Sequence, residues 1–361
     1  MFYDKELRAI KRANRFREIK EYNAIDLASN DYLALASKKK QLKKAYKMLL
    51  KYNTFAPKAS LLVNGYHNIH KKFEQKIAKV NGFEQGVVVG SGFLANIALI
   101  EALVRRDDEL FIDSEYHASG VLASRLVNGV TTFEHNSAKD LEKKLKQSRA
   151  KRKIIAVEGI YSMSGDIVDK EIFELAKRFN AILIVDEAHS SGVLGKNLLG
   201  VFEHYNIKIE PNFIKMGTLG KAYGSYGAYI LASSEIIEFL INRAKPIIYS
   251  TAPSVFDIAL AYVNLKYILK NAKKLSKKLK KREKLARDIL NIKTKSQILP
   301  IEFKSNKDVL KVQKELLKSN ILVGAIRQPT VERPIIRVIL RLGVKKALLK
   351  EALEFIKSSN D

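Results

Sequence analysis

Cysteine is absent from this chain of 361 residues, and the absence rules out two kinds of structure. Neither a disulfide bond nor a thiolate metal site can form, which suits an enzyme of the cytoplasm. The chain also lacks any run of about 18 apolar residues, so we predict no transmembrane helix. Residues 1–6 are charged and lack the apolar core of a signal peptide, so export is not expected.

Acidic residues are few beside basic ones, since 38 Asp and Glu against 65 Lys and Arg leave a net charge of +27. Such a balance favours nucleic-acid binding, because Lys and Arg neutralise phosphates. However, the densest basic run, residues 273–287, spaces leucines at helical intervals, as in an amphipathic helix with one solvated face. No helix-turn-helix, zinc-finger or aromatic-basic RNA motif occurs. We therefore expect no nucleic-acid partner, and the charge suits a polyanionic substrate or an acidic carrier protein.

Apolar residues make up 47% of the sequence, enough for a large domain with a smaller one. We predict an N-terminal arm (residues 1–45), a large domain (46–251) and a small α+β domain (252–361). In the large domain, apolar runs alternate with helical stretches without an internal repeat. This pattern predicts an α/β fold with a mostly parallel sheet covered on both faces. Predicted strands lie at residues 87–89, 110–112, 154–157, 181–185, 213–216 and 229–231, then at 299–303, 321–323 and 335–340.

The segment from Thr218 to Gly224, Thr-Leu-Gly-Lys-Ala-Tyr-Gly, is the most informative part of the sequence. It follows an apolar strand, and its glycines suit a backbone that turns tightly or approaches a ligand closely. A lysine at position 221 is expected if its amine acts as a nucleophile, because burial lowers the pKa of a lysine and permits Schiff-base chemistry. A surface lysine in a glycine-rich turn explains this motif equally well on its own.

Two further strand ends give this lysine a specific meaning. Asp186 follows the strand at 181–185, where a lone aspartate is often a helix cap or part of an ion pair. Pyridoxal phosphate needs both groups, because a lysine binds its aldehyde and a carboxylate keeps its pyridine nitrogen protonated. Residues 90–93, Gly-Ser-Gly-Phe, lead from a strand into a helix, where amides and the helix dipole bind a phosphate. Ligands in such sheets bind beyond the carboxyl ends of the strands, so we expect the cofactor there.

The order of these and other motifs resembles that of the pyridoxal-phosphate-dependent α-oxoamine synthases, which have fold type I. The similarity extends from Ile25 to about Arg341. It is carried by the segments Ser29–Leu33, Gly92–Asn96, Asp113–Ser119, Glu158–Asp166, Asp186–Gly195, Thr218–Lys221, Tyr249–Ala252 and Arg327–Val331. The resemblance implies a fold type I transferase whose large domain binds the cofactor.

The resemblance also implies roles around the cofactor. Lys221 would bind the aldehyde as a Schiff base and later transfer a proton, Asp186 would pair with the pyridinium nitrogen, and His117 would stack on the ring. The other implied cofactor-binding residues are His189 and Ser162 at the phenolic oxygen, with the amides of Gly92 and Phe93 and the hydroxyl of Thr218 at the phosphate. Thr251 would reach the phosphate of the partner subunit, which implies a homodimer.

Substrate-binding residues are implied in the arm and the small domain. Asn30 lies in the segment that approaches the amino-acid carboxylate in this family, and Arg15 or Arg17 would contact the acyl substrate, whose channel Thr330 would line. A carboxylate is best bound by a guanidinium fork, for which Arg337 is the first candidate and Arg341 the second. The chain departs from the family at Leu61, which stands where an arginine is usual.

The reaction implied by the resemblance is a decarboxylative condensation of an amino acid with an acyl thioester. Overall likeness favours L-alanine and a pimeloyl thioester, carried by coenzyme A or acyl carrier protein, as in biotin synthesis. Family members that use glycine with an acetyl thioester, or serine, share the scaffold. A basic binding protein on a degenerate enzyme scaffold is the alternative from another class, and the intact Lys221, Asp186, His117 and His189 argue against it.

Overall fold

The computed structural model describes residues 2–292 and 295–359. The described residues fall into two compact units. The small unit lies within Met1–Tyr32, Met163–Gly165 and Lys277–Asp361, and the large unit comprises Leu33–Ser162 and Asp166–Ser276. Within the described chain, no helix has both the length and the apolar character needed to cross a membrane.

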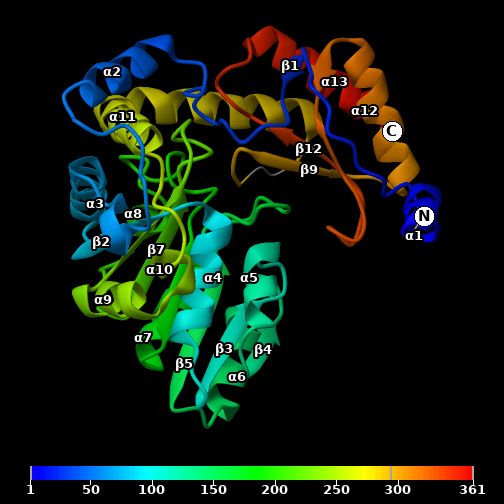
Figure 1. Ribbon diagram of the computed structural model, residues 1–361. Coiled ribbons are helices and arrows are strands. Elements are labelled where there is room, and N and C mark those ends of the chain that lie inside the picture. The colour runs from blue at the N-terminus through cyan, green and yellow to red at the C-terminus, as the bar shows by residue number, and fades with distance from the viewer. Residues whose placement is uncertain (1, 293–294, 360–361) are drawn as a thin grey trace. The chain divides into compact units, whose positions relative to one another are not determined.

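The large unit is built on a 7-stranded sheet of order β2-β8-β7-β6-β5-β3-β4 (Figure 1). The strands are β2 (Gln85–Val89), β3 (Asp108–Asp113), β4 (Val130–Phe133), β5 (Arg152–Glu158), β6 (Ile182–Asp186), β7 (Phe213–Thr218) and β8 (Ala228–Ala232). Only β8 runs against its neighbours, so the other strands of this sheet share one direction. The predicted α/β architecture with a mostly parallel sheet is confirmed.

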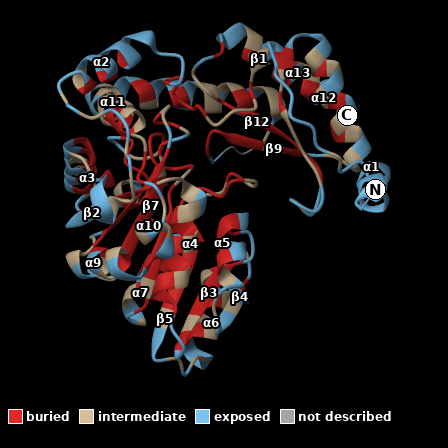
Figure 2. Cartoon of the chain, viewed as in Figure 1, coloured by how far each residue is buried: buried red, intermediate tan, exposed pale blue. Residues whose placement is uncertain are grey.

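Helices cover both faces of this sheet, which is why its strands are apolar almost throughout (Figure 2). On one face, Ile214 and Met216 of β7 pack in the same core as α4 (Gly92–Leu103). On the other face, Phe213 of β7 meets Phe173 of α7 (Glu171–Arg178) and Phe202 of α8 (Val201–His204). The other helices of the large unit are α2 (Lys39–Leu49), α3 (Asn68–Asn81), α5 (Ala118–Ser124), α6 (Ala138–Gln147), α9 (Ser234–Arg243) and α10 (Lys245–Ile248), with a π-helix, η1, at Leu61–Gly65.

The small unit has an antiparallel sheet of order β11-β12-β9 and a separate two-stranded parallel ladder. Its strands are β1 (Ile25–Asp26), β9 (Ile298–Glu302), β10 (Ile321–Leu322), β11 (Gly324–Ile326) and β12 (Ile335–Ile339). Its helices are α1 (Asp4–Arg12), α12 (Asn306–Lys318) and α13 (Lys346–Ser358). This is the α+β mixture that the sequence predicts for the C-terminal region, with β1 added from the N-terminal arm.

The boundaries between the units differ from those predicted at residues 45 and 251. The arm joins the large unit from Leu33 onward, and the C-terminal boundary falls inside α11 (Val255–Leu290), between Ser276 and Lys277. The reason is packing: the first turns of α11 belong to the large unit, where Asn264 Nδ2 donates to the carbonyl of Tyr223 at 2.7 Å. Because the boundary falls inside one continuous helix, the composition of the sequence does not change there and does not indicate it.

Candidate active site

The first residues of four segments that carry the family resemblance lie at one edge of the large sheet. Glu158 ends β5, Asp186 ends β6 and Thr218 ends β7, while Gly92 begins α4 just after β2. These strands run in one direction, so their carboxyl ends meet at the same edge. Segments far apart in the sequence thereby come together.

Lys221 and His189 are in direct contact. The Nζ atom of Lys221 lies 2.8 Å from Nε2 of His189. The two turns that carry them are packed tightly, because a Cβ on Gly192 would lie only 2.4 Å from Cβ of Ala222, and Gly192 has φ +92°, a conformation that favours glycine. The turn after β6 and the turn after β7 thus bring an amine and an imidazole together.

Asp186 is 4% exposed and held by hydrogen bonds on both carboxylate oxygens. Asn96 Nδ2 donates to Oδ2 at 2.8 Å, and the backbone amide of Ala188 donates to Oδ1 at 2.9 Å. Asn96 is fixed in turn, since it donates to Ser119 Oγ at 2.9 Å and accepts from the hydroxyl of Tyr116 at 2.8 Å. This network fixes the orientation of the carboxylate. The sequence pointed to Asp186 but not to the supporting roles of Asn96 and Tyr116, although Asn96 stands one helical turn after Gly92.

His117 precedes α5, and its Nδ1 atom lies 2.7 Å from the hydroxyl of Ser119. Burial lowers the pKa of the His117 imidazole; Asp186 raises it, and Lys221 lowers it further. Because the net shift is downward, the ring is predominantly neutral at neutral pH. A neutral, half-buried imidazole suits stacking on an aromatic ligand.

The start of α4 offers an anion site beside Thr218. The hydroxyl of Ser91 caps the helix by accepting from the amide of Leu94 at 3.2 Å. A Cβ on Gly92 would lie 3.7 Å from Cβ of Thr218, so the helix start and the end of β7 are adjacent. The amides of Gly92 and Phe93 stand in the first turn, where a helix has no acceptor of its own for them.

Glu158 is the second buried carboxyl at this edge, paired in register with Asp186 and 1% exposed. Its Oε2 accepts from the amide of Ser162 at 3.0 Å, whereas Oε1 has no hydrogen-bond partner among the described residues. Burial, and then the charge of Asp186, raise the pKa of Glu158 well above its usual range. A buried oxygen without a hydrogen-bond partner at the sheet edge is a group that a polar ligand can satisfy.

These residues fit pyridoxal phosphate. Lys221 would bind the aldehyde, Asp186 would hold the pyridine nitrogen, and the first turn of α4 with Thr218 would hold the phosphate. His189, Ser162 and His117 surround the same edge. Among the described residues, no cluster of His, Cys, Asp and Glu is suited to a metal ion.

Thr251 and Leu61 lie on an exposed, apolar part of the large unit. Thr251 forms an isolated antiparallel bridge with Ser60, directly before Leu61, the first residue of η1. Apolar side chains exposed in the same segments are Leu62, Val63 and Tyr249, at 49%, 79% and 79%. Such exposure is typical of a surface that another protein covers.

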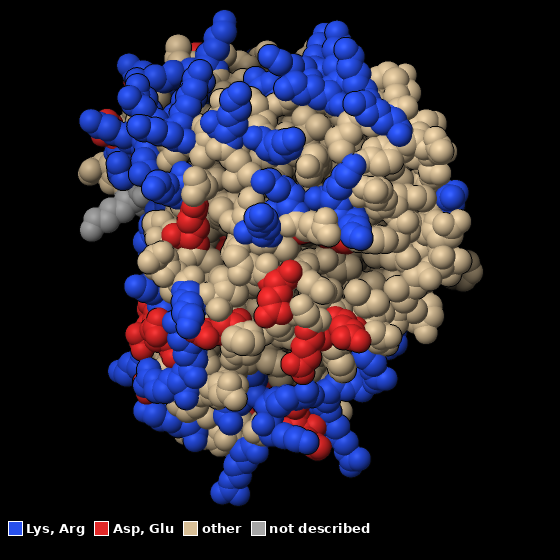
Figure 3. All heavy atoms as spheres, turned by 90° about the vertical axis from the view of Figure 1, so that its left-hand side faces the viewer, with Lys and Arg blue, Asp and Glu red and all other residues tan. Residues whose placement is uncertain are grey.

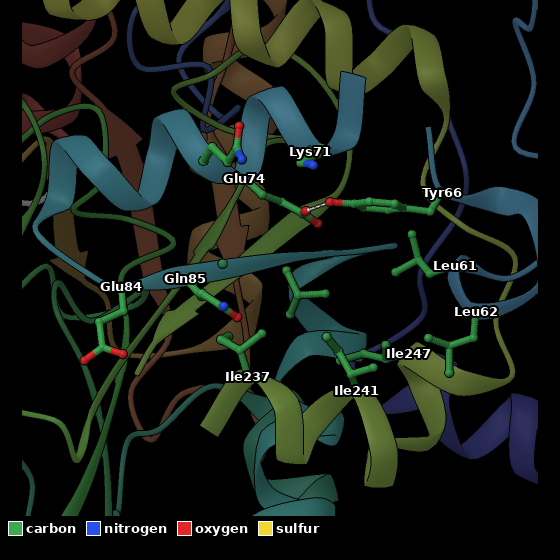
Figure 4. Close-up of a pocket in the computed structure, with 13 residues that line it drawn as sticks. Leu61, Leu62, Tyr66, Lys71, Glu74, Glu84, Gln85, Ile237, Ile241 and Ile247 are labelled. Atoms are coloured by element: carbon green, nitrogen blue, oxygen red, sulfur yellow. Dashed lines mark hydrogen bonds between the residues drawn. The ribbon is translucent and has the colours of Figure 1, made fainter. Parts of the chain in front are cut away.

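A cavity of about 500 Å³ opens beside η1 and is lined by none of the predicted site residues (Figure 4). Leu61 and Ile237 are among its apolar lining residues, and Glu74 and Tyr66 form part of its polar side. The buried Glu74 accepts hydrogen bonds from the hydroxyl of Tyr66 and, at 2.9 Å, from the amide of Val88. Burial raises the pKa of Glu74 to about 7.

The small unit brings Asn30 and Arg337 together. Arg337 lies on β12, is 6% exposed, and donates from Nη2 to Oδ1 of Asn30 at 3.1 Å. Arg341 binds two carboxylates instead, those of Asp26 and Asp31, the latter at 2.8 Å. Of the two candidate arginines, Arg337 is thus the one beside the predicted substrate residue.

The predicted acyl-binding residues lie at the surface of the small unit. Arg17 donates from Nη2 to the hydroxyl of Thr330 at 3.4 Å, so this arginine lies beside the predicted channel residue. Arg15 is exposed just after α1, where its amide donates to the carbonyl of Ile10.

Comparison with known proteins places this geometry in context. The family model for class I and II aminotransferases matches residues 22–356. The chain is 43% identical to 8-amino-7-oxononanoate synthase of Helicobacter pylori (strain ATCC 700392 / 26695), covering 94% of this chain and 92% of that protein. It is 35% identical to a putative 8-amino-7-oxononanoate synthase of Aquifex aeolicus, covering 99% and 96%.

Solved structures agree on the fold. The crystal structure of 8-amino-7-oxononanoate synthase from Francisella tularensis is 27% identical and superposes with a TM-score of 0.79, over 93% of this chain and 97% of that one. A serine palmitoyltransferase from S. paucimobilis reaches a TM-score of 0.90 at 22% identity, over 99% and 97%, a likeness of fold alone.

The raised pKa of Glu74 predicts a pH effect on stability. Between about pH 4.5 and 7, folded Glu74 keeps its proton while the unfolded chain releases it, so the free energy of unfolding falls as pH rises through this window. The whole effect is on the order of 3 kcal/mol. Urea titrations at several pH values should show a shallower fall for Glu74→Gln than for the parent. The exposed control Glu235→Gln should keep the parent's slope, and equal slopes in all three proteins would contradict the assignment.

Proposed function

This chain belongs to the family of class I and II aminotransferases, and from that premise we propose that it joins L-alanine to a pimeloyl thioester, giving 8-amino-7-oxononanoate, CO2 and the free thiol. The observation that carries the proposal is the contact between Lys221 and His189 at the sheet edge that also holds Asp186, in a chain 43% identical to a curated 8-amino-7-oxononanoate synthase. The chain is thus a pyridoxal-phosphate-dependent enzyme of fold type I, and its substrates are the proposed part.

The cofactor, when bound, would supply an electron sink that stabilises negative charge on the amino-acid Cα. The residues of the chain would do the rest. Lys221 would anchor the aldehyde and, once released by the amino group of L-alanine, take the Cα proton at its Nζ atom. Asp186, held by Asn96, would keep the pyridine nitrogen protonated. His117 would stack on the ring, and His189 and Ser162 would bind its phenolic oxygen.

The carbon and electron balance of the proposed reaction is simple. A bond forms between Cα of L-alanine and the thioester carbonyl carbon, and the carbon–sulfur bond breaks to release the thiol. The bond from Cα to the alanine carboxylate then breaks to release CO2, and a proton returns to Cα. No outside oxidant or reductant is required.

Arg337 and Asn30 are the proposed partners of the alanine carboxylate. Their contact at 3.1 Å supports this assignment, as does the engagement of Arg341 by Asp26 and Asp31. Arg17, rather than Arg15, is favoured for the acyl substrate because it reaches Thr330, the proposed channel residue.

We also propose that two copies of the chain form the working enzyme in the cytoplasm, with Thr251 of one subunit reaching the phosphate held by its partner. The exposed apolar residues around Thr251 support this arrangement. Lys and Arg gather in patches on the face shown in Figure 3, beside a broad area with few charged side chains. The net charge of +27 suits a polyanionic acyl carrier, either coenzyme A or acyl carrier protein, and nucleic acid is not among the proposed partners.

Replacing Lys221 with alanine tests the centre of the proposal. The parent with pyridoxal phosphate should show the visible absorbance of a lysine Schiff base, and Lys221→Ala should lose both this absorbance and turnover, because the amine is the group that reacts. Lys196→Ala, a lysine in the loop after β6, should retain both. Full turnover by Lys221→Ala would refute the assignment.

The choice of substrates is tested by kinetics with L-alanine, glycine and L-serine against pimeloyl and acetyl thioesters. L-alanine with the pimeloyl thioester should give the highest kcat/KM. A pocket shaped for one methyl group discriminates by about 1–3 kcal/mol, roughly 10- to 200-fold, so glycine should retain measurable activity. If glycine with the acetyl thioester were the best pair, the chain would be a glycine acyltransferase instead.

Arg337→Lys should raise the KM for L-alanine at least about tenfold, because an ammonium cannot grip a carboxylate with two parallel hydrogen bonds. Arg341→Lys is the matched control: it weakens the contacts to Asp26 and Asp31 and should lower the melting temperature more than it changes KM. The reverse pattern in steady-state kinetics would make Arg341 the carboxylate-binding residue.

A further inference from the structure

A second lysine lies in the middle of the large sheet. Lys215 is the third residue of β7, and its side chain is 0% exposed. Its neighbours Ile214 and Met216 pack in the core with α4, so the alternation of the strand directs Lys215 to the opposite face. An ammonium group buried there is costly unless charges and hydrogen bonds offset the loss of water.

Three oxygen atoms surround the Lys215 ammonium. Its Nζ lies 3.2 Å from Oε1 of Glu187 and donates to Oδ1 of Asn81 at 2.9 Å and to the carbonyl of Leu199. An ammonium has three hydrogens to donate, so the number of oxygens matches. Burial lowers the pKa of Lys215, and Glu187 opposes the shift. The amine of Lys215 is therefore fully enclosed, with these three oxygens as its nearest polar neighbours.

Glu187 is 0% exposed and connects this lysine to the loop that follows β6. Its Oε2 accepts from the hydroxyl of Ser190 at 2.5 Å and from the amide of Val201 at 2.8 Å. Gly200, with φ +104°, leaves no room for a larger residue, because a Cβ there would lie 1.7 Å from Oε2 of Glu187. One carboxylate therefore fastens both ends of the segment 187–201.

That segment carries His189, a cofactor-binding residue of the proposed site. Asp186 directly precedes Glu187, and His189 directly precedes Ser190, whose hydroxyl Glu187 holds. Gly192 in the same segment packs against Ala222, next to Lys221. Glu187 is therefore two residues from His189 and five residues from Gly192, which contacts the residue after Lys221.

We propose that Lys215 and Glu187 are a positioning pair. Together they hold residues 187–201 from the face of the sheet opposite α4, so that His189 contacts Lys221. The inference rests on the proposed function, because it concerns the same reaction. It also separates the two lysines by role. Lys221 reacts, whereas Lys215 is enclosed by its three oxygens on the other face of β7 and holds the scaffold.

The test is a spectroscopic pH titration of the enzyme loaded with pyridoxal phosphate, without substrates. In Lys215→Met, the Glu187 carboxylate loses its counter-charge, and its grip on Ser190 and Val201 weakens. The titration midpoint of the lysine Schiff base should then move by about one pH unit, a size expected when a charge-assisted hydrogen bond is lost. The value of kcat should fall about tenfold or more, with the KM for the amino acid changed less.

Lys177→Met is the matched control, because Lys177 is a partly exposed lysine on α7 paired with Glu174 at 3.4 Å. It should titrate like the parent. Should Lys215→Met fail to fold, the double variant Lys215→Met with Glu187→Met removes both charges, a replacement that cores often tolerate. It should fold and show a shifted midpoint, because Ser190 and Val201 still lose their acceptor.

The outcomes separate the two proposals. A parent protein that shows no Schiff-base absorbance overturns the proposed function. If the parent shows normal absorbance, and a folded Lys215 variant has the same titration midpoint and the same kcat as the parent, the positioning role is overturned. A shifted midpoint in the Lys215 variants but not in Lys177→Met supports it.

Discussion

The shared direction of the strands in the large sheet is the constraint on which the candidate site depends. β5, β6 and β7 end at one edge, so Glu158, Asp186 and Thr218 become neighbours without being close in sequence. The alternation of side chains then decides which residues face the cofactor side. A register shift of one residue in β6 would exchange Asp186 for Glu187 and destroy the site. Burial of the strands on both faces prevents such a shift.

Buried polar groups of the large unit hold one another in place on both sides of the sheet. Asp186 is fixed by Asn96, and Asn96 by Tyr116. Lys215 and Glu187 are enclosed by oxygens and donors on the opposite side of the sheet. In contrast, the large excess of Lys and Arg is carried mainly at the surface (Figure 3). The charged groups of the candidate site and its support are therefore distinct from the many charged groups at the surface.

The sequence predicted much of this arrangement, because long apolar runs indicate buried strands and because the polar motifs at several strand ends, taken together, indicate one site. β4 was missed since its sequence, Val-Thr-Thr-Phe, is short and only its last residue is buried. The reversed direction of β8 leaves no mark in the sequence. Asn96 and Tyr116 act through a side-chain network that only the fold creates. Lys215 is visible in the sequence as a charged residue inside an apolar run. Its partner Glu187 is determined by a tertiary contact and not by spacing along the chain.

The pairing of β1 with β10 has a consequence for the life of the nascent polypeptide. Ile25 pairs with Ile321, so 296 residues must be synthesised after the first strand emerges from the ribosome before its partner exists. At about 5–20 residues per second, that delay is roughly 15–60 s. Leu27, wholly buried in the finished protein, stays exposed to water throughout the interval. This segment leaves the ribosome long before its partner and is protected only afterwards, and a chaperone that shields it during translation would act where the exposure is long.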